Sequence, residues 1–108
     1  MKVYKTDHLP ENADTCCVKT KVRELTNAQS FAINLFEMEP GGYSPLHNHP
    51  SEHRIIVLEG EGVVFDGEKA LHIQSGDVIF IDASEQHQFK NVGEKPLKFL
   101  CITVNIKE

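Results

Sequence analysis

The chain has 108 residues, of which 40% are hydrophobic and 25% charged, with a formal net charge of −5 at pH 7. This composition is typical of one ordinary globular domain, which buries about 60 to 70% of its unfolded surface on folding and needs no disulfide to do so. The negative charge excludes a general affinity for nucleic acid or anionic lipid, because both require a basic face, and leaves small molecules and proteins as partners.

The amino-terminal residues do not resemble a targeting signal. They read MKVYKTDHLPENADT and lack the apolar core of a signal peptide. No stretch of the chain approaches the ~18 apolar residues of a membrane helix. We therefore expect a cytoplasmic protein that does not enter a membrane.

The chain has three cysteines, of which Cys16 and Cys17 are adjacent. Adjacent cysteines are too close for an ordinary unstrained bridge, and they lack the Cys-x-x-Cys spacing of redox and zinc sites. The simplest expectation is that all the cysteines are reduced and that Cys101 is a small core residue. The alternative is a vicinal pair that oxidises or captures a soft metal ion.

The apolar runs are short and rich in β-branched or aromatic residues, with turn residues about every eight to twelve positions. This spacing is typical of a β-sandwich or β-barrel, and helical periodicity is weak throughout. Large apolar side chains are expected in the core, namely Phe36, Met38, Tyr43, Phe80 and Phe89. The expected strands are 19–25, 31–39, 54–59, 62–65, 68–74, 77–81, 86–91 and 97–105.

Two local patterns refine this picture. Asp66-Gly67 lies between GVVF and EKALHI, and this pair favours a type I′ turn, so residues 62–74 are predicted to form a hairpin. The runs RIIVL at 54–58 and VIFI at 78–81 do not alternate, which indicates strands that are covered on both faces. In so small a chain, one of those faces is expected to pack against a second copy, as a homodimer.

Three histidines lie close together in the segment SPLHNHPSEHRIIVLEGEG at 44–62. Side chains at i and i+2 of an extended segment share a face, so His47 and His49 can share one ion. His53 has the same parity, but a straight strand would carry it about 13 Å from His49. The chain must therefore turn between them, where Pro50 and Ser51 lie.

The remaining histidines fall into two groups, one expected to face the barrel interior and one expected to face solvent. His53 begins a strand with its ring turned inward, and His87 shares a face with Phe89. Buried imidazoles are costly without a partner, and a divalent metal would satisfy His47, His49, His53 and His87 together. His8, in the polar amino-terminal segment, and His72, in the hairpin, are expected to face solvent.

These spacings resemble the two motifs of the cupin superfamily, a jelly-roll β-barrel with a metal in its mouth. The first motif falls at 41–60, on Gly41, His47, His49, His53 and Gly60. The second falls at 76–91, on Gly76, Asp82, Ser84, His87 and Asn91. The resemblance implies an all-β, single-domain jelly-roll barrel of the RmlC-like type that spans residues 1–108.

The sequence departs from the motifs at three positions. Asp82 and Ser84 replace a proline and a glycine, which alters a turn. His53 stands where the family usually has a glutamate ligand, and the run resembles a subgroup of small cupins with a four-histidine site. Glu52 is the competing ligand, but its parity places it on the face opposite to His53.

A four-histidine site implies particular chemistry. Neutral ligands leave the full charge of a divalent ion in the pocket, so the pocket should favour a small anionic organic ligand. Imidazole suits zinc, copper, iron and nickel, and the resemblance favours manganese or iron.

Three functions remain open after this reading. The first is a metal-dependent enzyme of the oxidation or dioxygenation type, placed slightly ahead of isomerisation or decarboxylation. No residue stands out as a general base, which counts against isomerisation because that reaction needs a positioned proton carrier. The second is a non-catalytic cupin that binds a small ligand or metal as a sensor or storage module. The third is a structural barrel that holds no metal. The catalytic residues are unknown at this level.

Overall fold

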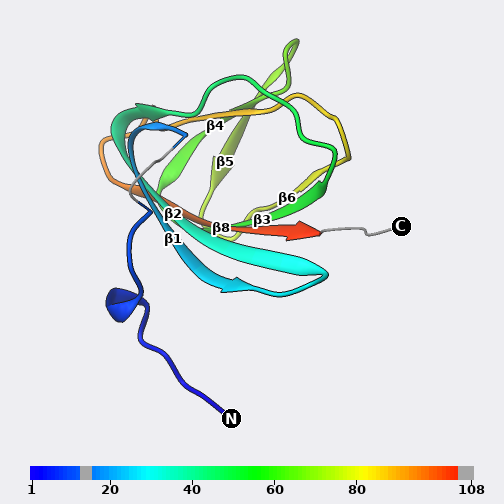
Figure 1. Ribbon diagram of the computed structural model, residues 1–108. Coiled ribbons are helices and arrows are strands. Elements are labelled where there is room, and N and C mark those ends of the chain that lie inside the picture. Colours follow the sequence, from blue (N-terminus) through cyan, green and yellow to red (C-terminus); the bar gives the residue numbers. More distant parts are fainter. Residues whose placement is uncertain (13–15, 105–108) are drawn as a thin grey trace.

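The computed structural model describes residues 1–12 and 16–104. They form an 8-stranded antiparallel sheet in the order β5-β4-β7-β2-β8-β3-β6, with β1 paired to β2. The strands are β1 (Val18–Asn27), β2 (Phe31–Tyr43), β3 (Glu52–Glu59), β4 (Glu61–Phe65), β5 (Ala70–Gln74), β6 (Val78–Ile81), β7 (Gln88–Lys90) and β8 (Leu97–Val104). The sheet curls into a jelly-roll barrel, in which β4 and β5 lie across from β1, β2 and β8 (Figure 1).

Helix is almost absent, as the sequence predicted. A 3-10 turn at Thr6–His8 is the helical element of the described residues. Within that part of the chain, no helix is long and apolar enough to cross a bilayer. All the predicted strands are present with shifted ends, and residue 105 of the last one lies outside the described residues.

Alternation along the strands builds the core. In β3, His53, Ile55 and Val57 are buried while the residues between them are partly exposed. Met38 and Phe89 are buried as expected and Phe36 packs against the core, but the expectation was wrong for Tyr43 and Phe80, which are 45% and 68% exposed. The core consists of Met38, Ile55, Val57, Val64, Ile73, Ile81, Phe89, Leu97 and Phe99.

The predicted hairpin at 62–74 is present, but the predicted type I′ turn is wrong. Phe65 pairs with Ala70, so the connection is longer than two residues. Asp66 closes it by donating its N–H to the Lys69 carbonyl and by accepting, through Oδ1, the N–H groups of Glu68 and Lys69 at 2.8 and 2.7 Å. The carboxylate thus satisfies the loop backbone and keeps Asp66 out of the positive-φ region that a type I′ turn requires.

The expectation that β3 and β6 are covered on both faces is not met within one chain. Val78 and Phe80 on the outer face of β6 are 56% and 68% exposed, and Leu58 of β3 is 42% exposed. The Arg54 guanidinium of the neighbouring strand lies over the Phe80 ring, 4.5 Å from its centroid. We call these four residues the outer patch.

The cysteines also differ from the simplest expectation. Cys16 and Cys17 are joined by a disulfide just before β1, so the vicinal pair considered as the alternative is the one observed. Cys101 is a free thiol on β8 and is partly buried. The adjacency argument failed because the chain here is outside a strand and can turn both side chains together.

Candidate metal centre

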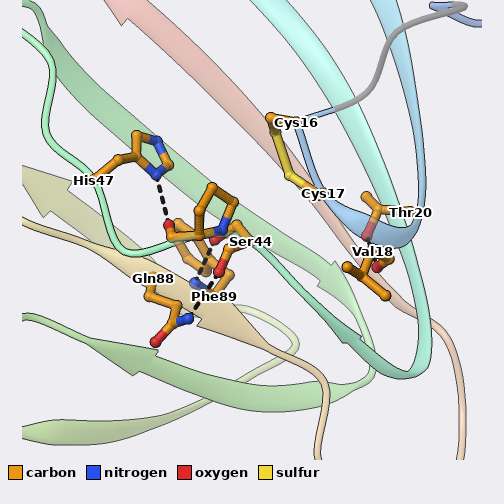
Figure 2. The surroundings of a disulfide bond; sticks show 9 residues. Cys16, Cys17, Val18, Thr20, Ser44, His47, Gln88 and Phe89 are labelled. Carbon is orange, nitrogen blue, oxygen red and sulfur yellow. Dashed lines mark hydrogen bonds between the residues drawn. A yellow bond between two sulfur atoms is a disulfide. The ribbon is translucent and has the colours of Figure 1, made fainter.

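Backbone hydrogen bonds hold the segments that carry His47 and His87 together. The His47 N–H donates to the His87 carbonyl at 3.2 Å, and the His87 N–H donates back at 2.9 Å. Ser44 extends this pairing, because its N–H donates to the Phe89 carbonyl and its Oγ accepts the Phe89 N–H at 2.8 Å (Figure 2). The two sequence motifs therefore meet at these histidines through the backbone, independently of the imidazole rings.

His49 is fixed by the loop between β6 and β7. The Ser84 N–H donates to the His49 carbonyl at 2.6 Å. Ser84 adopts a φ of 65°, the left-handed region that favours glycine, and it occupies the position where the cupin motif has a glycine. Ser84 therefore keeps the backbone conformation that glycine favours, although the residue itself differs from the motif.

His53 comes from β3, where it pairs with Thr103 of β8 and Ile81 of β6. Its side chain is buried, with Nδ1 at 3.2 Å from Thr103 Oγ1 and at 3.5 Å from Cys101 Sγ. Its Nε2 is buried and has no hydrogen-bond partner among the described residues. A buried polar atom without a partner is costly, so this nitrogen fits a site that supplies a ligand.

The rings of the candidate ligands gather in one place. The nearest ring nitrogens of His47, His49 and His87 all lie within 4.8 Å of one another, a spacing that could hold a metal ion. His53 is not a member of that group of three, but its ring lies beside it, with its centroid 5.2 Å from that of His49 and 5.4 Å from that of His87. The structure thus brings the rings of all the histidines expected at the site together, with His47, His49 and His87 as the group whose ring nitrogens could share an ion.

Carbonyl groups orient two of these rings. His47 Nδ1 lies 2.6 Å from the Pro45 carbonyl, and His87 Nδ1 lies 3.0 Å from the Glu85 carbonyl. A ring nitrogen can only donate to a carbonyl, so each Nδ1 carries the hydrogen and each Nε2 is left with a lone pair. Carbonyl partners of this kind are the usual orienting contacts of metal-binding histidines.

The electrostatics of the cluster favour neutral rings. Burial, followed by the neighbouring imidazoles, lowers the pKa of His53 to about 4. Burial also lowers the pKa of His87, and burial with the charge of His47 lowers that of His49. Neutral imidazole is the form that binds metal, so the donors are ready for an ion at pH 7. The donor set therefore fits a divalent transition metal.

The cluster opens into a cavity of about 530 Å³. Much of its wall is apolar and includes Phe36 and Phe99, whose rings stack 4.9 Å apart. Cys101, Thr103 and Asn34 line it on the β2 and β8 side. No Asp or Glu of the described residues lines this cavity, so the histidines and the Cys101 thiol are its titratable groups.

The remaining candidates lie elsewhere. The Glu52 carboxylate is 3.5 Å from the Arg54 guanidinium and is not a cavity residue, which agrees with the parity argument that preferred His53. His72 is exposed and contacts Glu61 at 3.3 Å, and His8 is exposed in the 3-10 turn, as expected for both.

Asn91 of the second motif forms hydrogen bonds that connect backbone segments. Its buried side-chain amide donates to the carbonyls of Met38 and Lys95 at 2.8 and 2.9 Å, and its Oδ1 accepts the Gly93 N–H. It therefore ties β2 to the segment after β7 and does not face the histidines.

Sequence reasoning missed several cavity residues. Asn34 and Thr103 share the inward face of their strands with apolar residues, and strand parity could have identified them. The proximity of Cys16 and Cys17 to the histidines had no sequence signal, because these residues lie outside the strands and far from the histidines in sequence.

Comparison with known proteins identifies relatives of this chain. Residues 34–103 match the family model described as "Cupin domain". An oxalate-binding protein of Thermotoga maritima is 39% identical over 69 residues, which cover 63% of this chain and 57% of that protein. A 1-methylthio-D-xylulose 5-phosphate methylsulfurylase of Rhodospirillum rubrum is 30% identical over 76 residues, covering 70% of this chain and 49% of the relative. The matched regions thus span only about half of these curated relatives.

A solved structure shows the same fold. The polyketide cyclase RemF from Streptomyces resistomycificus superposes with a TM-score of 0.86 and 28% identity, over 96% of this chain and 79% of the cyclase. The relatives act on or bind chemically different molecules, according to their names, so the shared barrel does not by itself specify a substrate.

Proposed function

The chain belongs to the cupin family, and on that premise we propose that it is a metal-binding cupin that acts on a small anionic organic molecule. One divalent transition metal per chain would be held by His47, His49, His53 and His87. The observation that carries this proposal is the buried His53 Nε2, which has no hydrogen-bond partner among the described residues and belongs to a ring beside His49 and His87. Manganese or iron is proposed as the ion, while zinc, nickel and copper also suit imidazole donors.

The ligand is proposed to combine an anionic head with an apolar body. The histidines form one part of the cavity wall, and the stacked Phe36 and Phe99 rings form another. A cavity of about 530 Å³ is far larger than a two-carbon dianion such as oxalate. Apolar pockets with a few convergent polar groups are typical of sites for small organic ligands, and this one has room for a ring or chain behind the anionic group.

The residues of the cavity favour chemistry at the ion. When bound, a divalent metal polarises a coordinated anion and lowers its pKa. The chain itself supplies orientation: the Pro45 and Glu85 carbonyls fix two rings, and the apolar wall can pack against the organic part of the ligand. No carboxylate of the described residues is placed as a general base, so oxidation or dioxygenation is preferred to isomerisation or decarboxylation.

A non-catalytic role is the second candidate. The same absence of a carboxylate in the described cavity wall suits a protein that binds without turnover. One relative is itself an oxalate-binding protein. Turnover of an oxidisable substrate by the metal-loaded protein, stopped by His87→Ala, would exclude this alternative.

The first test is metal content by plasma mass spectrometry on tag-free protein purified without added metal or chelator. We expect about one equivalent of a transition metal in the parent, and its loss in His53→Ala and in His87→Ala. His72→Ala is the matched control, because His72 is an exposed histidine outside the cavity, and it should retain the parent's metal. An absence of metal in the parent after reconstitution would overturn the proposal.

A further inference from the structure

All the cysteines of the chain line the same cavity as the histidines. Figure 2 shows the Cys16–Cys17 disulfide near the segments that carry Ser44 and His47. The pair precedes β1, and Cys101 lies on β8. The proposed metal chemistry uses none of these sulfur atoms, so the pair requires its own account.

The two bonded cysteines differ in accessibility. Cys16 is exposed, whereas Cys17 is partly buried. Thiol–disulfide exchange requires a thiolate to reach a sulfur atom, and the rate depends on access to the atom that is attacked. A small thiol arriving from solvent can therefore reach Cys16 and release Cys17 as the leaving thiolate. No acidic residue of the described cavity wall is placed to repel the incoming thiolate.

We propose that Cys16 and Cys17 form a thiol–disulfide exchange site in the wall of the histidine cavity, with small thiols as its reactants. A thiolate attacks Cys16 Sγ, which breaks the Cys16–Cys17 bond and forms a mixed disulfide on Cys16. A second thiolate attacks the mixed disulfide at the sulfur of the small thiol. This releases the small-molecule disulfide, and the two cysteine thiolates take up protons.

The balance of the cycle defines its co-reactants. Two small thiols lose two electrons in total and become one disulfide, while the protein disulfide becomes a dithiol. The reverse reaction, with a small-molecule disulfide as oxidant, restores the bond. The reduced form presents two neighbouring thiols to the cavity, which can capture a soft, thiol-reactive centre. This proposal does not depend on whether the histidines hold an ion.

A trivalent arsenical tests the site directly, because it condenses with two neighbouring thiols and releases water. Protein isolated in air-equilibrated buffer should show the free Cys101 alone on thiol titration after unfolding, and all its cysteines after reduction. The reduced protein should then bind one equivalent of phenylarsine oxide. Cys16→Ser and Cys17→Ser should each lose this binding, and Cys101→Ser, the matched control, should keep it.

Two readouts connect the site to exchange and to the cavity. In Cys17→Ser, a small thiol with its disulfide should leave a stable mixed disulfide on Cys16, visible by peptide mass. In the metal-free protein, the arsenical adduct should slow carbethoxylation of His47 by diethyl pyrocarbonate several-fold and leave that of the exposed His72 unchanged. Three free thiols before reduction, unchanged arsenical binding in Cys16→Ser, no mixed disulfide on Cys16, or an unaffected His47 would each overturn the proposal.

Discussion

At the scale of single residues, the barrel holds the His53 imidazole in place through one ring nitrogen and leaves the other without a partner in the described chain. Thr103 and Cys101 lie against its Nδ1, and its Nε2 is buried without a partner in the described chain. Placing the ring costs stability unless something binds it, which is the condition expected of a ligand. Its identity as a candidate could be predicted from strand parity and the cupin motif. Its partners could not, because Thr103 lies fifty residues away in sequence and meets it only through the β3–β8 pairing.

The depressed pKa of His53 predicts how the metal-free protein responds to acid. Its folded-state pKa of about 4 lies below the usual 6.5, so between these values the unfolded chain binds more protons than the folded one. The contribution of neutral His53 to the free energy of unfolding is therefore complete above pH 6.5 and is lost as the pH falls towards 4. The cavity is open to solvent, which screens the effect, and we expect a loss of about 2 kcal/mol. Urea unfolding of the metal-free protein across this range measures it.

The matched variants separate His53 from the other histidines. His53→Gln should reduce the change in unfolding free energy between pH 7 and pH 4, because the depressed group is gone. His72→Gln, at an exposed histidine paired with Glu61, should leave the change as it is in the parent. An equal pH response in His53→Gln and the parent would contradict the assignment.

At the scale of elements, the turns that end β3 and precede β6 share a backbone feature and differ in their surroundings. Gly60 and Gly76 have φ values of +83° and +93°, which L residues with a side chain rarely adopt. A Cβ on Gly60 would collide with the Pro96 carbonyl, whereas a Cβ on Gly76 would meet nothing within 4 Å. The first glycine is therefore required by both conformation and space, and the second by conformation alone.

Alanine at each glycine separates these two requirements. Gly76→Ala should lower the free energy of unfolding by about 1 kcal/mol, which is the cost of a positive φ. Gly60→Ala should lower it by about 3 kcal/mol, because the collision adds to that cost. Paired urea denaturation curves measure the difference. Equal effects would show that the Pro96 segment moves away at no cost.

The elements also show what a sequence reading can and cannot provide. The strands were predictable, because alternation and turn residues act over a few positions. The turn at Asp66 was predicted wrongly, because its carboxylate caps two backbone N–H groups and stabilises a longer loop. Cys16 and Cys17 were expected to be reduced, and their disulfide depends on a local path outside any strand. The strands and the ligand candidates could therefore be predicted from local sequence patterns. The capping of the turn by Asp66 and the disulfide could not, because they depend on side-chain contacts that these patterns do not encode.

At the scale of the whole molecule, the outer patch leaves apolar surface exposed at one end of the sheet. β6 pairs with β3 alone, so it is an edge strand, and its outward side chains Val78 and Phe80 are more than half exposed. Edge strands with apolar faces are normally covered, because they promote unspecific association. Two β6 strands related by a two-fold axis would place each Phe80 beside the other copy and give a self-complementary contact. We propose a homodimer through this patch.

A charge at Phe80 tests the dimer. Analytical ultracentrifugation of the parent should show a dimer at micromolar concentration, and Phe80→Asp should weaken the association about 30-fold or more, as expected for a central aromatic contact. Leu71→Asp is the control, because Leu71 is 59% exposed on β5, at the opposite end of the strand order. A monomeric parent would contradict the proposal.

The reciprocal backbone bonds between His47 and His87 have a consequence for the ion itself. They join the two ligand segments without any contribution from the rings, so the donors stand ready before an ion arrives. Imidazole donors suit several divalent ions, and which of them is bound depends on metal availability as well as on ligand type and geometry. The occupant should then follow supply. The ion recovered from this protein would record which metals the growing cell had to spare when the chain folded.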